Sequence, residues 1–159
     1  MHELLILRHA EAEPAPPGGT DLERILSDHG EAQAHATGQW LLAREALPDR
    51  ILCSPAARTR STVTRLTATW PRAGIPVDYV DDIYEASPGQ LLALLDRQDP
   101  GLGRVLLVGH NPGTERLLAL LCEGRSGGYR GMPAAALAWI RLDGPLEPGN
   151  GRLLAFHTP

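Results

Sequence analysis

The chain has 159 residues and a net charge of −4, and 43% of its residues are hydrophobic and 21% charged. This length and balance predict one globular domain spanning residues 1–159, and the acidic charge argues against a surface that coats nucleic acid. All fifteen basic residues are arginine. Arginine binds planar oxyanions through paired hydrogen bonds, although compositional drift accounts for most of such a bias.

Targeting signals are not evident in the sequence. The opening segment, MHELLILRHA, lacks the basic region and the long apolar stretch of a signal peptide, and no apolar run approaches the ~20 residues of a membrane span. Cys53 and Cys122 lie in apolar runs, which favours buried thiols in a reducing compartment over a disulfide or a metal site. We therefore expect a cytoplasmic protein that does not bind a membrane.

Short apolar runs alternate with longer amphipathic stretches along the chain, a pattern typical of an α/β fold. In chain order, the predicted strands are Glu3–Leu7, Arg50–Cys53, Val77–Val80, Arg104–Val108, Ala135–Leu142 and Arg152–Phe156. The predicted helices are Gly30–Glu45, Ala56–Trp70, Pro88–Arg97 and Pro112–Cys122. The runs LLIL and VLLV are apolar at every position, which indicates central strands covered on both faces. Together these features predict a three-layer α/β/α sandwich with a mostly parallel central sheet.

Helix-start signals precede two of the predicted helices. Ser87 followed by Pro88 is typical of an N-cap with proline at the first helical position. Asn111 followed by Pro112 repeats this pattern directly after a strand. The segment Glu13–Thr20 is rich in proline and glycine and is predicted to be a loop.

Polar side chains follow three of the predicted strands at the point where each strand ends. In open parallel sheets the carboxyl ends of neighbouring strands lie at one edge, where ligands bind. Two of these strands lead directly into helices, whose N-terminal N–H groups favour anions. This edge is predicted to bring together two arginines, two histidines and an asparagine. Such a set favours a phosphate-binding site over a cation-binding site. These five residues are Arg8 and His9 after LLIL, Arg58 after ILC, and His110 and Asn111 after VLLVG, and Ser54 also follows ILC.

A neutral imidazole is a competent nucleophile toward phosphorus. Nearby arginine charges lower the pKa of a histidine and favour its neutral form, and they also stabilise a transferring phosphoryl group. No metal ion or other cofactor is then needed. Each residue alone has a simpler explanation, because a histidine at a strand end can bind a loop carbonyl and Arg58 can be a solvated helix residue. The joint occurrence at three strand ends favours the phosphate site.

Three segments, LLILRHAEAEP, CSPAARTRST and VLLVGHNPG, resemble in this order the signature segments of the histidine phosphatase superfamily, which has the phosphoglycerate-mutase-like fold. The resemblance implies a mostly parallel sheet with helices on both faces. It also implies that His9 is the nucleophile and becomes phosphohistidine. By the same resemblance Arg8 and Arg58 bind the phosphate, and His110 contacts the phosphoryl group in the transition state. Asn111, at the same strand end as His110, is a further phosphate-binding candidate.

Two further segments, Arg24–Ser27 with Gly30 and Met132–Ala138, resemble the short bacterial phosphohistidine phosphatase subfamily. Ala10 stands where many relatives carry glycine, and this small residue is expected to preserve activity. Glu85 matches the position of a carboxylic acid that protonates the leaving group in many members, a role that requires a raised pKa. Alternatively, Glu85 is a loop carboxylate ahead of a helix start, where the helix dipole favours negative charge.

Larger members of the superfamily insert a helical cap between the second and third of the signature segments. Here the interval Thr59–Arg104 holds one predicted strand and one predicted helix, so we expect no helical cap and an open site. An open site admits a phosphorylated side chain on another protein, which favours a partner of the histidine-phosphotransfer type. Arg125 and Arg130, in the predicted loop Gly124–Pro133, are candidate contacts for this partner or solvated residues.

The sequence therefore predicts a metal-independent phosphatase that acts through a covalent intermediate on His9, with phosphohistidine of a partner protein as its substrate. A phosphatase for a small phosphorylated metabolite is the nearest alternative, and a catalytically silent module that binds phosphorylated partners is another. Mutase activity is disfavoured because the chain is too short to enclose and reorient an intermediate. A metal-dependent hydrolase is disfavoured because the six histidines show no HxH or HExxH spacing.

Overall fold

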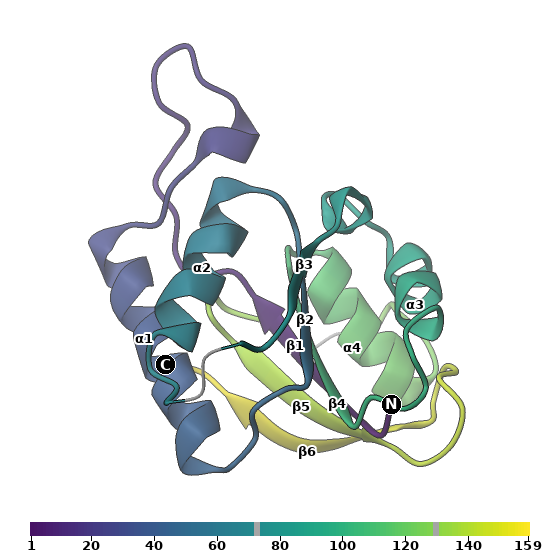
Figure 1. Cartoon of the computed structure of the whole chain (residues 1–159). Helices are drawn as coiled ribbons and strands as arrows, with labels where there is room; N and C mark the ends of the chain where they lie inside the picture. The colour runs from purple at the N-terminus through teal and green to yellow at the C-terminus, as the bar shows by residue number, and fades with distance from the viewer. Residues whose placement is uncertain (72–73, 129–130) are drawn as a thin grey trace.

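The computed structural model describes residues 1–71, 74–128 and 131–159, which form a six-stranded sheet between two layers of helices (Figure 1). The strand order is β3-β2-β4-β1-β5-β6. The first four of these strands run parallel, and β5 and β6 are each antiparallel to the strand before them in this order. The strands are β1 (Glu3–Arg8), β2 (Arg50–Cys53), β3 (Val77–Tyr79), β4 (Arg104–Gly109), β5 (Leu137–Leu142) and β6 (Gly151–His157).

Two α-helices cover each face of the described sheet. On one face α1 (Asp28–Ala43) packs beside α2 (Ala57–Thr67), and on the other α3 (Pro88–Asp96) packs beside α4 (Gly113–Glu123) (Figure 1). Each helix pair encloses its own hydrophobic core against the sheet. The predicted three-layer α/β/α sandwich is confirmed, and in the described ranges no helical cap covers it.

The central strands β1 and β4 are buried because they are apolar on both faces. Leu4–Leu7 and Val105–Val108 have no exposed surface, and the two strands pair in parallel along their whole length. Alternate residues of β1 enter the core beneath α3 and α4 and the core beneath α1 and α2. Because burial of each such side chain contributes about 1.5–3 kcal/mol, these strands form a firm base for the residues at their ends.

The start of α3 follows the sequence prediction, whereas the start of α4 does not. Ser87 Oγ accepts a hydrogen bond from the Gln90 N–H (3.2 Å), and the proline that follows Ser87 opens the helix. Asn111 is predicted as the N-cap of α4, but this prediction is wrong because the helix begins at Gly113 with Pro112 as its N-cap. Asn111 Oδ1, the atom that would cap the helix, accepts a hydrogen bond from the Thr114 hydroxyl (2.7 Å) and not from a helix N–H.

The other predicted elements are present, with two notable differences at their ends. The helix predicted to reach Trp70 ends at Thr67. The strand predicted from Ala135 begins at Leu137, because Ala135 has a positive φ of 57° and cannot continue an extended strand. Both differences fall at element ends, where sequence patterns are least informative.

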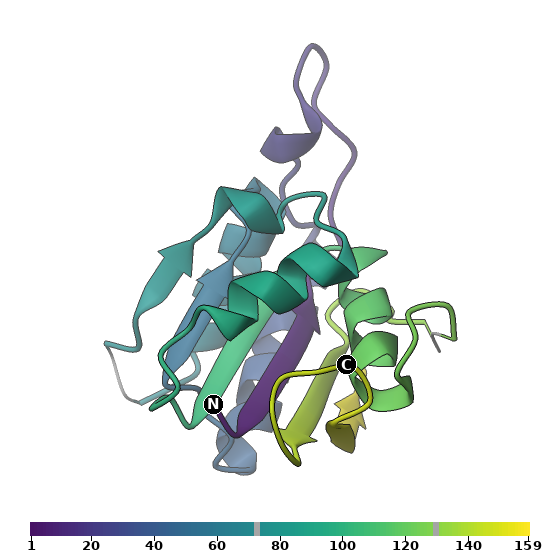
Figure 2. The same cartoon turned by 90° about the vertical axis from the view of Figure 1, so that its right-hand side faces the viewer.

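Two short 3₁₀ helices, η1 (Asp21–Glu23) and η2 (Asp81–Ile83), are absent from the sequence predictions. η1 lies in the β1–α1 loop, residues 9–27, which stands away from the body of the fold beyond the carboxyl ends of the parallel strands (Figures 1 and 2). This loop therefore extends from the edge of the sheet where the polar strand ends lie.

The two cysteines differ in burial. Cys53 is fully buried in β2, whereas Cys122 in α4 is partly exposed, so the prediction of two buried thiols is correct for Cys53 only. Burial raises the pKa of the Cys53 thiol to about 12. Across residues 1–71, 74–128 and 131–159, no helix combines the length and the hydrophobicity needed to cross a membrane.

Candidate active site

The sheet topology brings the three polar strand ends together. β4 lies between β1 and β2 and runs parallel to both, so the three carboxyl ends meet at one edge. Just beyond the strands, the His9 N–H donates to the Gly109 carbonyl (3.0 Å) and the Ser54 N–H donates to the Val108 carbonyl (3.1 Å). These backbone bonds hold His9, Ser54 and His110 close together at this edge.

His9 is held in one orientation and is only 9% exposed. Its Nδ1 lies 2.7 Å from the Ala10 carbonyl oxygen, so Nδ1 carries a proton and donates to that oxygen. Its Nε2 accepts a hydrogen bond from the Arg58 Nε–H (3.3 Å) and therefore carries the lone pair of the neutral ring. Burial is the main cause that lowers the pKa of His9 to about 4, and the charges of Arg58 and Arg8 add to it. The pKa of His9 is thus lowered, as predicted, but burial causes more of this shift than the arginine charges to which the prediction attributes it.

His110 is oriented by a buried serine. Its Nε2 lies 2.7 Å from Oγ of Ser54, which also accepts a hydrogen bond from the Ala56 N–H (3.4 Å). Among the described residues, His110 Nε2 is the one acceptor within reach of the Ser54 hydroxyl, so this hydroxyl donates its proton to Nε2. In a neutral His110 ring, Nε2 is therefore unprotonated and the ring proton is on Nδ1. Nδ1 is buried and has no partner in the same residues, and the ring centroid lies 5.2 Å from that of His9. Burial, followed by the charge of Arg58, lowers the pKa of His110 to about 3.

Arg58 is fixed by a carboxylate that the sequence motifs did not reveal. Arg58 Nη1 and Nη2 donate to the backbone carbonyl (2.7 Å) and to Oδ2 (2.9 Å) of Asp21. The Tyr84 hydroxyl donates to the same Oδ2 (2.6 Å), and Arg24 Nη1 donates to Asp21 Oδ1 (3.2 Å). Hydrogen bonds from these side chains hold the pKa of Asp21 well below its ordinary range, and Asp21 in turn raises the pKa of Tyr84. Asp21 thus stays ionised and directs the Arg58 Nε–H toward His9.

Arg8 and Asn111 meet at the Met132 carbonyl. Arg8 Nη1 donates to this oxygen (2.8 Å), and Asn111 Nδ2 donates both to it (3.0 Å) and to Oε2 of Glu115 (3.1 Å). Asn111 Oδ1 accepts from the Thr114 hydroxyl (2.7 Å), so both ends of the amide are engaged inside the protein. Burial lowers the pKa of Arg8, and the nearby charge of Glu115 partly opposes this shift. The Arg8 Nε atom is buried and has no hydrogen-bond partner among the described residues. Arg8 therefore offers a donor for a ligand, whereas the Asn111 amide holds the loop that Arg8 contacts.

The first residues of the β1–α1 loop are packed closely against α1 and α2. Ala10 is fully buried, and its N–H donates to Thr62 Oγ1 (3.1 Å). A Cβ at Gly30 would overlap the Glu11 carbonyl oxygen, so this glycine allows α1 to approach the loop. Ser27 Oγ accepts from the Gly30 N–H (3.0 Å) and donates to Glu11 Oε1 (2.7 Å), which caps α1 and ties it to the loop. The motif residues of this segment thus fix the backbone that follows His9.

A cavity of about 570 Å³ opens beside these residues. Arg58, Tyr84 and His110 line it together with the exposed side chains of Glu85 and Arg116. Glu85 has a positive φ of 56°, an uncommon conformation for a residue other than glycine or asparagine. The predicted proton donor thus lies at the rim of the cavity, and the buried arginine and histidine lie at its floor. In the part of the chain that the structure describes, no group of three or more His, Cys, Asp or Glu side chains is arranged to hold a metal ion.

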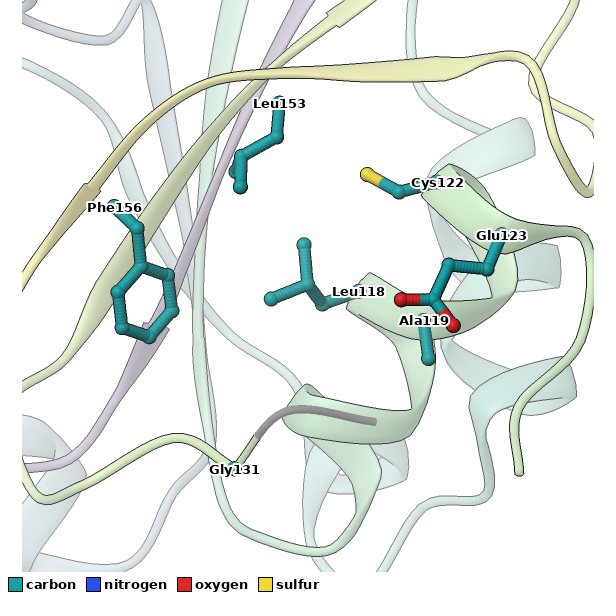
Figure 3. A pocket seen from close by; sticks show the side chains of 7 residues that line it. All are labelled: Leu118, Ala119, Cys122, Glu123, Gly131, Leu153 and Phe156. Atoms are coloured by element: carbon teal, nitrogen blue, oxygen red, sulfur yellow. The ribbon is translucent and has the colours of Figure 1, made fainter. Parts of the chain in front are cut away.

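A second cavity, of about 200 Å³, lies between α4 and β6 (Figure 3). Its lining is mostly apolar and lacks the convergent polar groups of the strand ends, so we do not assign it as the active site. The residues that line the apolar cavity are Leu118, Ala119, Cys122, Glu123, Gly131, Leu153 and Phe156.

Two arginines are predicted as contacts for a partner protein. Arg125 is exposed in the loop after α4, and Arg130 lies outside the described residues.

Sequence reasoning missed Asp21 and Tyr84, which reach the site from loops. A capping box between Thr20 and Glu23, readable from the sequence, indicates an ordered turn around Asp21. No spacing rule connects this turn to Arg58, which lies 37 residues further along the chain. The predicted residues that the structure brings together are Arg8, His9, Arg58 and His110.

Residues 4–101 match the sequence model of the histidine phosphatase superfamily (branch 1), and the chain belongs to this superfamily. It is 31% identical to an uncharacterised protein of Mycobacterium tuberculosis, over 96% of this chain and 99% of that protein. Its structure is similar to that of the putative phosphohistidine phosphatase SixA from Agrobacterium tumefaciens, with a TM-score of 0.86 and 32% identity over 99% of this chain and 98% of that one. A putative phosphohistidine phosphatase SixA from Nakamurella multipartitia gives a TM-score of 0.80 and 28% identity over 99% and 96% of the two chains. These full-length similarities place the chain among the short, SixA-like members, and its membership supports phosphatase activity.

Proposed function

We propose that the chain is a phosphatase that transfers a phosphoryl group from phosphohistidine of a partner protein to His9 and then to water. The observation that carries this proposal is the state of His9, whose Nδ1–H is fixed by the Ala10 carbonyl and whose Nε2 lone pair faces Arg58. The pKa of about 4 keeps Nε2 unprotonated near neutral pH. A buried, neutral imidazole beside arginines is suited to attack phosphorus.

In the first step, the Arg58 Nε–H turns from His9 Nε2 to a phosphoryl oxygen. The lone pair of Nε2, now free, forms a bond to phosphorus while the bond from phosphorus to the leaving group breaks. Arg8, Arg58 and the Nδ1–H of His110 stabilise the charge on the phosphoryl oxygens. The phosphorylated ring of His9 carries a positive charge, which the hydrogen bond from Nδ1–H to the Ala10 carbonyl stabilises. When phosphohistidine is the substrate, its ring carries a proton on the other nitrogen, so the leaving group departs as a neutral imidazole and no separate proton donor is required.

In the second step, a water molecule attacks phosphorus and the bond between phosphorus and His9 Nε2 breaks. The electron pair of that bond returns to Nε2, and both protons of the water stay on the departing phosphate, H₂PO₄⁻. The enzyme is thereby restored with a neutral His9. Because arginines and N–H groups supply the positive field throughout, the proposed reaction requires no metal ion.

Two observations support a protein as the substrate. In the described ranges no helical cap closes the cavity, and the side chains of Glu85 and Arg116 at its edge are exposed. A phosphorylated side chain on another folded protein can therefore reach His9. Two of the solved structures that the chain resembles are those of putative phosphohistidine phosphatases. A catalytically silent binding module is disfavoured, because the nucleophile and both arginines are present.

A phosphatase for a small phosphorylated metabolite is the second candidate, and the size of the cavity favours it. The volume of about 570 Å³ falls within the range of about 300–1,000 Å³ that is typical of small-molecule sites. For an alkyl phosphate the leaving group is an alkoxide, which needs a proton in the transition state. We propose that Glu85, which lines the same cavity as Arg58 and His110, donates that proton.

A turnover comparison tests the two candidates. We expect kcat/KM for a phosphohistidine-bearing histidine-phosphotransfer domain to exceed that for any sugar phosphate by about a hundredfold, roughly 2.7 kcal/mol. A metabolite that is turned over as efficiently as the protein would favour the second candidate. EDTA should leave both rates unchanged, and a loss restored by a divalent ion would indicate a metal-dependent hydrolase instead.

A further inference from the structure

The β1–α1 loop carries two large apolar side chains on its surface. Leu22 is 42% exposed and Ile25 is 61% exposed, the highest fraction among the exposed large hydrophobic residues of the described chain. Single exposed apolar residues are common on protein surfaces. Here, however, the two lie three positions apart on a loop that stands away from the rest of the fold (Figure 2).

The loop is held in a defined shape by its own hydrogen bonds. At its base, Ala12 and Leu26 form an antiparallel bridge, and the Glu13 N–H donates to the Ile25 carbonyl (2.8 Å). Arg24 Nε donates to the Glu13 carbonyl (2.9 Å), which ties the two arms of the loop together. The capping box of η1 orders the outer turn. A surface on this loop is therefore largely preorganised for binding.

The same loop forms one wall of the proposed active site. Asp21, the neighbour of Leu22, binds Arg58 through its backbone carbonyl and its carboxylate, and it lines the cavity beside His110. Neither Leu22 nor Ile25 lines this cavity or the apolar cavity between α4 and β6. A small phosphorylated molecule in the cavity therefore leaves both side chains in water, whereas a protein seated over the cavity can cover them.

We propose, on the basis of the function proposed above, that Leu22 and Ile25 are docking contacts for the protein that carries the phosphohistidine. The complementary surface is an apolar patch next to the phosphorylated residue. The exposed carboxylates of Glu11, Glu13 and Glu23 lie on the same loop, so basic side chains border that patch on the partner. Burial of two aliphatic side chains at the edge of the site contributes affinity for the protein alone.

The double variant Leu22→Ala/Ile25→Ala tests this docking surface. The protein probe is the phosphohistidine-bearing phosphotransfer domain with the highest wild-type turnover in a panel of such domains. The small-molecule probe is p-nitrophenyl phosphate. We expect kcat/KM for the protein probe to fall at least tenfold, mainly through a higher KM, and kcat/KM for p-nitrophenyl phosphate to stay within twofold of wild type. The unchanged small-molecule activity also shows that the variant is folded.

Leu154 and Phe156 provide a matched control on β6, because they are 41% and 40% exposed. The variant Leu154→Ala/Phe156→Ala should leave kcat/KM unchanged for both probes. An equal loss on both probes in the loop variant, or no loss on the protein probe, would overturn the docking surface while leaving the proposed function in place. A wild-type enzyme that hydrolyses p-nitrophenyl phosphate but none of the phosphohistidine domains would overturn the proposed function and the docking surface together.

Discussion

The floor and the rim of the candidate site are held in different ways. At the floor, His9 is 9% exposed and follows the buried strand β1. Arg58 is 5% exposed and lies in the first turn of the packed helix α2. At the rim, Glu85 and Leu22 are exposed and belong to loops. The floor is thus fixed by the same packing that stabilises the fold, and burial sets the pKa of its histidines. The rim can vary without loss of the fold, which is the usual arrangement for residues that choose the substrate.

The largest effect is expected from removal of His9, the proposed nucleophile at the floor. His9→Ala should lower kcat by about four orders of magnitude or more, because the covalent step has no substitute. Rapid quench of the wild type should trap an acid-labile, base-stable phosphoenzyme on His9, and the variant should show none. Phosphate found on Ser54, or no phosphoenzyme in a single turnover, would contradict the covalent mechanism.

The buried histidines of the floor should also make the fold sensitive to acid. Their folded-state pKa values of about 4 for His9 and about 3 for His110 lie below the ordinary value of 6.5. Between about pH 6.5 and 4 the unfolded chain therefore binds protons that the folded chain does not, so the free energy of unfolding falls as pH decreases. Each imidazole contributes a slope of about 1.4 kcal/mol per pH unit in this window.

Urea unfolding between pH 7 and pH 4.5 measures this slope. His9→Ala removes one of the two buried imidazoles, so its slope should be smaller by about 1.4 kcal/mol per pH unit. His35, which is exposed on α1, offers the control, because the variant His35→Ala should show the same slope as the wild type. Equal slopes in the wild type and His9→Ala would show that burial does not control the charge of His9.

A smaller effect is expected from Ser54, which supports the floor without being a proposed phosphate ligand. Ser54→Ala removes the hydroxyl that faces His110 Nε2 at 2.7 Å, so the ring proton is free to move from Nδ1 to Nε2. We expect kcat to fall by about ten- to a hundredfold with KM nearly unchanged. ¹⁵N NMR of the His110 ring should report the Nδ1–H tautomer in the wild type and a shift toward Nε2–H in the variant. A lowered kcat with an unchanged tautomer would assign Ser54 a packing role only.

The contrast between floor and rim also explains what could be predicted from the sequence. Arg8, His9 and His110 follow directly on apolar runs, so their place is decided by strand order alone. The contact of Asp21 with Arg58 depends on the path of an exposed loop, which no periodicity encodes. Asn111 shows a related difficulty. Its Oδ1 accepts from the Thr114 hydroxyl instead of capping the helix, and its Nδ2 donates to the Met132 carbonyl, a contact 21 residues away that the local sequence does not contain.

The smallest and most selective effect is expected at the rim, from Glu85→Gln. If Glu85 donates a proton to the leaving group, the variant should lose about tenfold or more in kcat on alkyl phosphates, whose alkoxide leaving groups need that proton. It should change little on p-nitrophenyl phosphate, because nitrophenolate leaves without help, and little on phosphohistidine, because imidazole is also a good leaving group. The ratio of kcat values for an alkyl phosphate and p-nitrophenyl phosphate, measured in the wild type and the variant, isolates this role. A loss by the same factor on every substrate would instead mean that Glu85 shapes the rim, and the proton for poor leaving groups would then come from solvent.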